Sequence, residues 1–144
     1  MSSRGVRDLL PWAHPFVMVD ALVECVPHEK VVAVKRVAAD DPMARGHESE
    51  GGALPASMVL EGLSQAAALL YQLTYEGIEA SRLPMLGHLS SRSCAPARPG
   101  DTIVYTVRAV KMTSTSGIFH GVAEVEGAPI AEAELGFSVP ETTT

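Results

Sequence analysis

The chain has 144 residues, 47% hydrophobic and 19% charged, which is the size and balance of one globular domain with one core. A net charge of −6 without a basic run excludes nucleic acid as an expected partner, and the absence of about 18 consecutive apolar residues excludes an expected membrane span. The first residues lack the features of a signal peptide, and Cys25 and Cys94 form no CxxC pair. We therefore expect a cytoplasmic protein with two reduced thiols.

The predicted elements come in a simple order: two strands, one long helix and then four strands. Runs rich in β-branched residues, or alternating in polarity, predict strands at residues 16–26, 31–38, 85–94, 102–111, 118–125 and 130–139. A long connection precedes the helix, and loops of this length in compact domains are often functional. Together the elements predict a single domain over residues 1–144, with flexible ends at 1–8 and 140–144.

The helix is expected over residues 56–75, because Pro55 occupies a position typical of helix starts and no proline follows within the run. The run is apolar around most of its circumference, which predicts burial on several sides. One buried helix with about six mostly antiparallel strands indicates an α+β fold whose sheet curls around the helix. Such a sheet leaves an edge exposed, and dimerisation is the usual way to cover it.

Glu61 is the unusual residue of this helix, because its neighbours from Met58 to Leu63 are almost all apolar. Burying a carboxylate costs free energy unless a partner compensates. His47 lies in the preceding connection, so only folding or a second subunit can bring the two side chains together. A histidine and a carboxyl group in a dry cavity can act as a base and an acid. A solvated His47, with a Glu61 that binds a buried amide, is the alternative that the residues alone leave open.

The spacing of these residues resembles a family signature. Residues 46–65 read GHESEGGALPASMVLEGLSQ and resemble the pattern GHFPxxPxxPGxxxxEAxxQ of the FabZ-type 3-hydroxyacyl-acyl-carrier-protein dehydratases, which have the hot-dog fold. The histidine, second inner proline, glutamate and glutamine of the pattern match His47, Pro55, Glu61 and Gln65. Further resemblances occur in register at residues 10–20, 41–47 and 86–101, so the similarity covers roughly residues 9–139.

The resemblance implies a role for each candidate site residue. His47 would remove the C2 proton of a 3-hydroxyacyl thioester, and Glu61 of a partner subunit would protonate the departing C3 hydroxyl group. The backbone amide of Gly87, helped by the helix start near Ala56, would polarise the thioester carbonyl, because the developing enolate makes the largest physical demand on the site. Gln65 would orient Glu61. A simple turn or bulge at Gly87 and a helix-surface position for Gln65 are the plainer alternatives.

The chain also departs from the family pattern. Glu48-Ser49 replaces Phe-Pro, Gly52 replaces the first inner proline, Ala56 replaces a glycine, and Gly62 replaces the alanine after the glutamate. The first two changes predict a looser and more acidic connection. Residues 52–56 (GALPA) are similar to the GxLPAW stretch of dehydratases from aryl polyene pathways, which favours a dedicated polyketide or polyene pathway over housekeeping fatty acid synthesis.

The implied partner is an acyl carrier protein with a phosphopantetheine-linked substrate. Carrier proteins of this kind are acidic, so basic residues are the natural docking surface, and Arg92 and Arg98 are the candidates. The family's basic run RFKRP is RSCAP here, which removes two positive charges. The histidines show no metal-binding spacing, so neither a metal nor a cofactor is expected.

Three hypotheses follow for the function. The leading one is a dehydratase that converts carrier-bound 3-hydroxyacyl thioesters to trans-2-enoyl thioesters, acting as a homodimer or a higher even oligomer. The second is a hot-dog acyl thioesterase, for which Glu61 alone would suffice. The third is a non-catalytic subunit of a heterodimeric dehydratase. His47, retained at the dehydratase spacing, favours the first.

Overall fold

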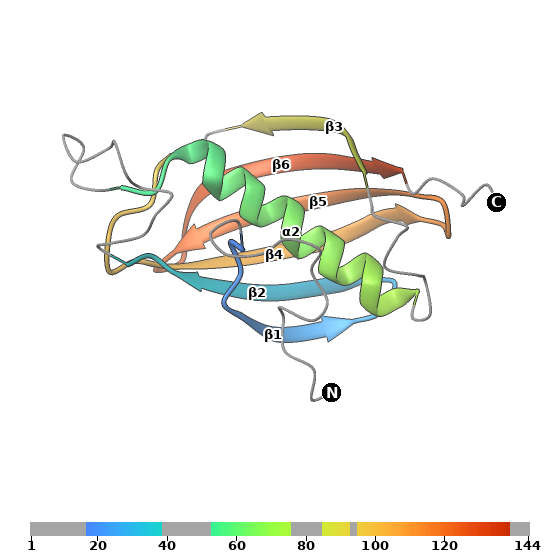
Figure 1. The fold of residues 1–144 in the computed structure, drawn as a ribbon, viewed down its shortest axis with the longest axis horizontal. Coiled ribbons are helices and arrows are strands. Elements are labelled where there is room, and N and C mark those ends of the chain that lie inside the picture. The colour runs from blue at the N-terminus through green and yellow to red at the C-terminus, as the bar shows by residue number, and fades with distance from the viewer. Residues whose placement is uncertain (1–16, 39–52, 76–84, 93–94, 139–144) are drawn as a thin grey trace.

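The structure is a computed structural model that describes residues 17–38, 53–75, 85–92 and 95–138. Six antiparallel strands form one sheet in the order β1-β2-β4-β5-β6-β3, and α2 runs diagonally across one face of it (Figure 1). The elements are β1 (Ala21–Val26), β2 (Lys30–Arg36), α2 (Ala56–Thr74), β3 (Met85–Arg92), β4 (Thr102–Met112), β5 (Ser116–Val125) and β6 (Ala128–Ser138). This arrangement confirms the predicted α+β hot-dog fold. The predicted flexible ends lie outside the described residues.

The strand boundaries differ from the predictions at the first strand and at the hairpins. The first strand was expected from residue 16, but β1 begins only at Ala21, and residues 17–20 are described outside any strand. The backbone N–H of Met18 donates to the side chain of Gln65 instead of to a neighbouring strand.

The turn between β5 and β6 was expected to extend through Pro129, but Val125 already pairs with Ala128 and Glu124 with Pro129. Only Glu126 and Gly127 remain in the turn, and both have positive φ, 52° and 79°. Two-residue turns of this kind match the twist of the flanking strands, so the ladder continues closer to the turn than its composition suggests.

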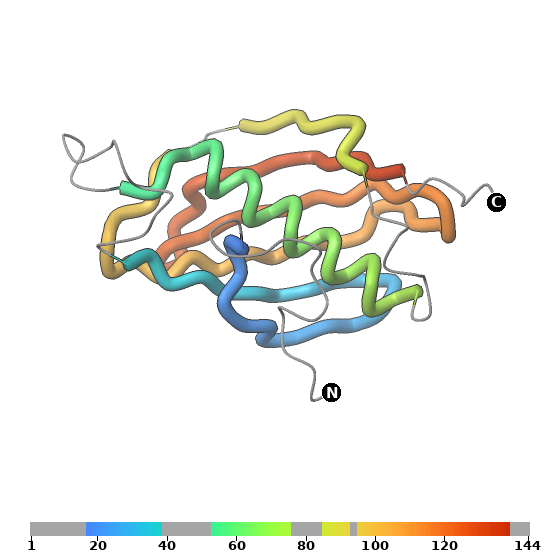
Figure 2. Tube along the Cα trace, viewed as in Figure 1, coloured from blue at the N-terminus to red at the C-terminus, as the bar shows by residue number. Residues whose placement is uncertain are grey.

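Helix α2 begins immediately after Pro55, whose carbonyl oxygen accepts hydrogen bonds from the backbone N–H groups of Met58 at 2.9 Å and Val59 at 3.2 Å. Every residue from Gly62 to Tyr71 is buried. This confirms the prediction of a helix covered on several sides. Figure 2 shows the helix crossing the sheet, with its first turns toward β6 and its last turns toward β2.

The two faces of the sheet differ in polarity, and we call them the helix face and the outer face. On β4, Ile103, Tyr105 and Val107 point to the helix face and are fully buried. The same alternation on β6 buries residues 131, 133, 135 and 137 and exposes Glu132 and Glu134. This period of two is what an antiparallel sheet with one covered face requires.

Strand β3 forms one edge of the sheet, and all eight of its residues are exposed in the single chain. Three of them are large and apolar: Met85 is 60% exposed, Leu86 44% and Leu89 39%. An apolar edge strand with an unpaired row of backbone groups is a template for pairing with another chain. The single chain therefore has an exposed sheet edge, as the sequence predicted. A dimer was expected to cover such an edge.

Candidate active site

Glu61 lies in the second turn of α2 and is half-buried in the single chain. Gln65, four residues later, is fully buried and donates a hydrogen bond from Nε2 to Oε1 of Glu61 at 3.2 Å. The other end of the same amide, Oε1, accepts a hydrogen bond from the backbone N–H of Met18 at 2.7 Å. The alternative that Gln65 is a helix-surface residue is therefore wrong.

The hydrogen bonds to Met18 and Glu61 give the buried amide of Gln65 one orientation. Met18 lies 47 residues away in sequence, in the segment that leads into β1, and its own side chain is buried. A buried N–H group without a partner costs about 1–3 kcal/mol, so the amide oxygen is held on Met18. The amide nitrogen must then face Glu61, and it can only donate to the carboxyl group. Tertiary structure thus fixes the side chain that donates a hydrogen bond to Glu61.

Ala56 is the first residue of α2, one turn before Glu61. Pro55 provides no side-chain cap, and the first turn contains no acidic residue. The backbone N–H groups of this turn therefore give the site the partial positive charge of a helix N-terminus. Leu54 and Ala97 hold the chain before the helix through two backbone hydrogen bonds, of 2.7 Å and 3.0 Å.

Gly87 lies in a β-bulge of β3, where the pairing with β6 shifts between Leu86 and His88. The simple-turn alternative is wrong, because the residue is inside a strand, and the bulge alternative is what the structure has. Bulges occur often beside active sites, where they redirect backbone groups. Within the described residues, no hydrogen bond joins Gly87 to the Glu61–Gln65 pair. His47 lies outside the described residues, so its distance from Glu61 stays untested.

The same bulge decides which face of the sheet Arg92 occupies. Leu86 pairs with Phe137 and Leu89 with Leu135, so both lie on the helix face, although they are three positions apart and regular alternation would put them on opposite faces. Without the bulge, regular alternation from Leu86 would place Arg92 on the helix face as well. The extra residue instead puts Arg92 opposite the exposed Glu132, on the outer face.

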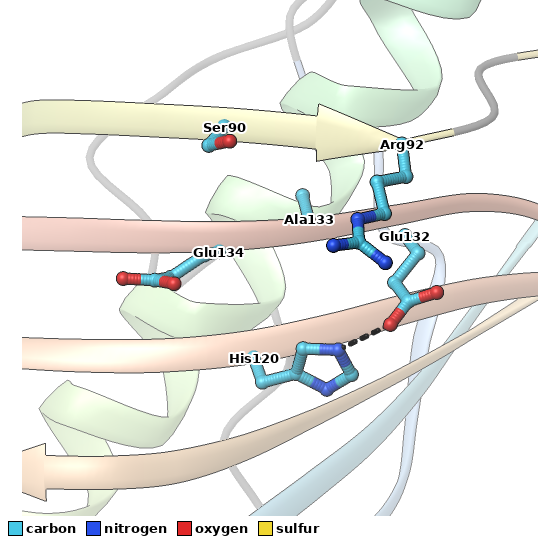
Figure 3. A pocket seen from close by; sticks show the side chains of 6 residues that line it. All are labelled: Ser90, Arg92, His120, Glu132, Ala133 and Glu134. Atoms are coloured by element: carbon cyan, nitrogen blue, oxygen red, sulfur yellow. Dashed lines mark hydrogen bonds and ion pairs between the residues drawn. The ribbon is translucent and has the colours of Figure 1, made fainter.

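Arg92 helps to line a shallow pocket of about 340 Å³ on the outer face, which we call the outer pocket. Its other lining residues are Ser90, His120, Glu132, Ala133 and Glu134. Nε2 of His120 lies 2.8 Å from Oε1 of Glu132, and Figure 3 shows the guanidinium group of Arg92 pointing toward this pair. One arginine against two glutamates leaves the outer pocket without a net positive charge when His120 is neutral.

Arg98 occupies a different position, in the exposed turn that leads into β4. Its backbone N–H donates to Oδ2 of Asp101 at 2.8 Å, and the Asp101 N–H donates to the Arg98 carbonyl oxygen at 3.0 Å. The preceding residue, Ala97, pairs with Leu54 just before α2. Arg98 is therefore close in space to the start of the helix that carries Glu61.

The described ranges offer little chemistry outside this site. They contain no group of three or more metal-binding side chains, and no helix in them is long and apolar enough to cross a membrane. Cys25 is a free thiol, and desolvation by burial raises its pKa. A raised pKa leaves less of the nucleophilic thiolate at neutral pH, so Cys25 has the character of a packing residue. Cys94 lies outside the described residues.

Comparison with known proteins decides the family. The model of the FabA-like domain matches residues 10–134. The chain belongs to this family. The 3-hydroxyacyl-[acyl-carrier-protein] dehydratase FabZ of Enterococcus faecalis is 34% identical over 137 residues, which cover 93% of this chain and 94% of that protein. The enzyme of the same name from Anaeromyxobacter sp. strain K is 36% identical over 133 residues, or 91% of this chain and 85% of that protein.

A solved structure supports the fold of this FabA-like chain. The dehydratase heterocomplex ApeI:P from Xenorhabdus doucetiae includes a chain that superposes with a TM-score of 0.83, covering 98% of this chain and 94% of that one. The sequences are 19% identical, so this likeness concerns the hot-dog fold alone.

Two contacts of the site were not expected from the sequence. The backbone N–H of Met18 holds Gln65, and Tyr105 of β4 packs against Gly62, the residue after Glu61. An interior helix glycine signals a close neighbour but does not say which residue approaches. For Met18 the sequence contains no signal, because the donor is a backbone group.

Proposed function

We propose that this FabA-like chain removes water from carrier-bound 3-hydroxyacyl thioesters and yields trans-2-enoyl thioesters, in fatty acid biosynthesis or in a dedicated polyketide or polyene pathway. The observation that carries the proposal is the hydrogen-bonded chain from Met18 through Gln65 to Glu61, on the helix of a FabA-like fold. It supplies an oriented carboxyl group at the helix position where a dehydratase needs its acid.

His47 and Glu61 divide the reaction between them in this proposal. His47 takes the proton from C2, and the electron pair of that C–H bond moves into the thioester as an enolate. The enolate then forms the C2–C3 double bond and expels the C3 hydroxyl group, which Glu61 protonates to give water. General acid–base catalysis of this kind contributes about 10²–10⁴-fold to the rate. The Gly87 N–H and the helix start at Ala56 would stabilise the enolate oxygen.

Gln65 has a specific part in this mechanism. An amide N–H that donates to one carboxyl oxygen of Glu61 fixes the plane of the group. The proton for the departing hydroxyl group is then carried by the other oxygen. Because the amide is neutral, it orients Glu61 without placing a full charge beside the carboxyl group.

The active form is proposed to contain at least two chains. The exposed apolar strand β3 supports this, since pairing with β3 of a second chain would continue the sheet and cover Met85, Leu86 and Leu89. A partner at this edge can be a second copy, giving a homodimer or higher even oligomer, or a related chain, giving a heterodimer. In either assembly, His47 of one chain would meet Glu61 of the other.

The proposed carrier is an acidic acyl carrier protein that delivers its substrate on phosphopantetheine. Arg98 is the better candidate for docking, because it is exposed and close to the helix start. Arg92 lies among carboxylates on the outer face, where an acidic partner gains less from it.

A test uses the purified protein with a 3-hydroxyacyl carrier thioester and follows the products by mass spectrometry. Loss of one water from the thioester supports the proposal. Release of a free acid would instead indicate the thioesterase, and no turnover by the chain alone, with turnover after adding a related chain, would indicate the heterodimeric subunit. Mixing His47→Ala with Glu61→Ala tests the placement across subunits, because mixed dimers regain one intact site.

A further inference from the structure

Tyr105 and Gly62 form a close contact beneath the proposed acid. Tyr105 lies on β4, points to the helix face and is fully buried. A Cβ atom added to Gly62 would overlap the hydroxyl group and Cζ of Tyr105 and would lie 2.6 Å from its Cε1. The end of the phenol ring therefore occupies the space that any side chain at residue 62 would need.

This contact sets how closely the helix approaches the sheet at Glu61. Gly62 follows Glu61 directly, so a shift of the backbone at one residue moves the other. The next residue is also held, because Leu63 Cδ2 fits into the space left by Gly121 on β5, where an added Cβ would lie 3.0 Å from it. Two successive helix residues are thus seated on two different strands, which restricts both the height and the rotation of this turn.

The residue at position 62 lowers the intrinsic stability of the helix. Glycine is a poor residue for a helix interior, and the family pattern has alanine at this position. Glycine at position 62 thus lacks the helix propensity of alanine, but it leaves the space that the phenol ring of Tyr105 occupies. We infer that Tyr105 is a positioning residue of the active site, which acts through Gly62 to hold the carboxyl group of Glu61 at the place where it meets the substrate.

This inference rests on the proposed function, because the role of Tyr105 is to place the proposed acid. The role of Tyr105 goes beyond packing, because Gly62 directly follows Glu61 and lies between the two hydrogen-bonded residues Glu61 and Gln65 in the helix. A displacement of about 1 Å of a catalytic group can cost about 10²-fold in rate. A change in the Tyr105–Gly62 contact should accordingly lower kcat more than it changes KM.

The experiment compares Gly62→Ala, Tyr105→Leu and the double variant in the dehydratase assay. Gly62→Ala should lower kcat by about 30-fold to 100-fold with KM within about twofold, because the methyl group pushes the helix away from the phenol. Adding Tyr105→Leu should restore kcat at least about tenfold, since the methyl group then has room. Adding Tyr105→Phe should restore little, because Cζ and Cε1 still overlap the methyl group.

Gly117→Ala is the matched control. Its added Cβ would lie 2.7 Å from a ring carbon of Phe119, which is also an overlap with a buried aromatic ring, although a milder one than at Gly62. Gly117 is the second residue of β5 and pairs with Met112 at the end of β4. Figure 1 shows that β5 begins at the end of the sheet away from the start of α2. This variant should lose thermal stability as Gly62→Ala does, while the folded protein keeps its kcat.

Each outcome decides the inference. Unchanged kcat in Gly62→Ala, or equal losses of kcat in Gly62→Ala and Gly117→Ala, would overturn it while wild-type turnover leaves the proposed function intact. If Gly62→Ala does not fold, Tyr105→Leu with and without Gly62→Ala gives the same test, since the double variant should be at least as active as Tyr105→Leu alone. An inactive wild-type protein would overturn the proposed function and this role together.

Discussion

Two glutamates on opposite sides of the sheet, Glu61 on α2 and Glu132 on β6, each make a hydrogen bond to a nitrogen-containing side chain. Their comparison separates the proposed acid from an ordinary surface carboxyl group. Glu61 meets Gln65 at 3.2 Å, and Glu132 meets His120 at 2.8 Å. The shorter contact belongs to the pair with less burial, in which the side chains are 44% and 49% exposed. Hydrogen-bond distance alone therefore does not distinguish the proposed acid from the surface carboxyl group.

The two pairs differ in how firmly the nitrogen-containing side chain is held and in how well water reaches it. Gln65 is fully buried and its far end is fixed by the Met18 backbone, so Glu61 has a rigid support. Water reaches both members of the outer pair and competes for their hydrogen bonds, which keeps such pairs weak. A carboxyl group with an anchored partner can be held in one geometry, which is what proton transfer to a substrate requires.

The largest test of this comparison is the removal of each carboxyl group in turn. Glu61→Gln should lower kcat about 10³-fold, because the amide cannot supply the proton for the departing hydroxyl group. Glu132→Gln is the control on the outer face and should change kcat less than about twofold. Steady-state kinetics with a 3-hydroxyacyl carrier thioester measures both, and equal effects would show that the two faces do not differ as proposed.

Removing the anchor should have the next largest effect. Gln65→Leu leaves Glu61 without its donor and the Met18 N–H without its acceptor, so stability should fall by about 1–3 kcal/mol. In the folded protein, kcat should fall about tenfold to 100-fold, because Glu61 loses its orientation. Gln72→Leu, on a half-buried position near the end of the same helix, should do neither. Urea unfolding and kinetics give the two measurements, and an unchanged kcat in Gln65→Leu would contradict the orienting role.

Arg98 and Arg92 test which region of the molecule binds the carrier protein. Arg98→Glu should raise KM for the carrier-bound substrate about fivefold to tenfold at low salt, and less at high salt because surface charges are screened. Arg92→Glu should raise KM less, because it adds a charge to a region that already contains Glu132 and Glu134. Salt-dependent kinetics distinguishes the two, and a stronger effect of Arg92→Glu would move the docking surface to the outer face.

The smallest expected effect is that of the outer pair itself. A double-mutant cycle with His120→Ala and Glu132→Ala should give a coupling below about 1 kcal/mol, because both side chains are about half exposed. Chemical unfolding measures the coupling, and kcat should stay within about twofold in all three variants. A larger coupling would show that the outer pocket is more shielded from water than its exposure indicates.

Much of the fold could be predicted from local pattern. The apolar circumference of residues 56–75 predicted a buried helix, and alternation along the strands predicted a sheet with one covered face. Both signals arise from neighbours in sequence, since each residue's face follows from the period of its own element. The errors were at element ends. Strand β1 begins at Ala21 and not at residue 16. Between β5 and β6, two residues with positive φ allow pairing that composition does not reveal.

The sequence by itself determined the order of elements, the burial of the helix and the spacing from His47 to Glu61 and Gln65 that resembles the dehydratase signature. Only the tertiary structure decided that Met18 anchors Gln65, that Tyr105 fills the space at Gly62, and that the Gly87 bulge turns Arg92 to the outer face. The physical reason is the distance along the sequence over which each feature is determined. A helix or strand pattern is set by residues a few positions apart, whereas these contacts join segments more than forty residues apart or depend on the register between two strands.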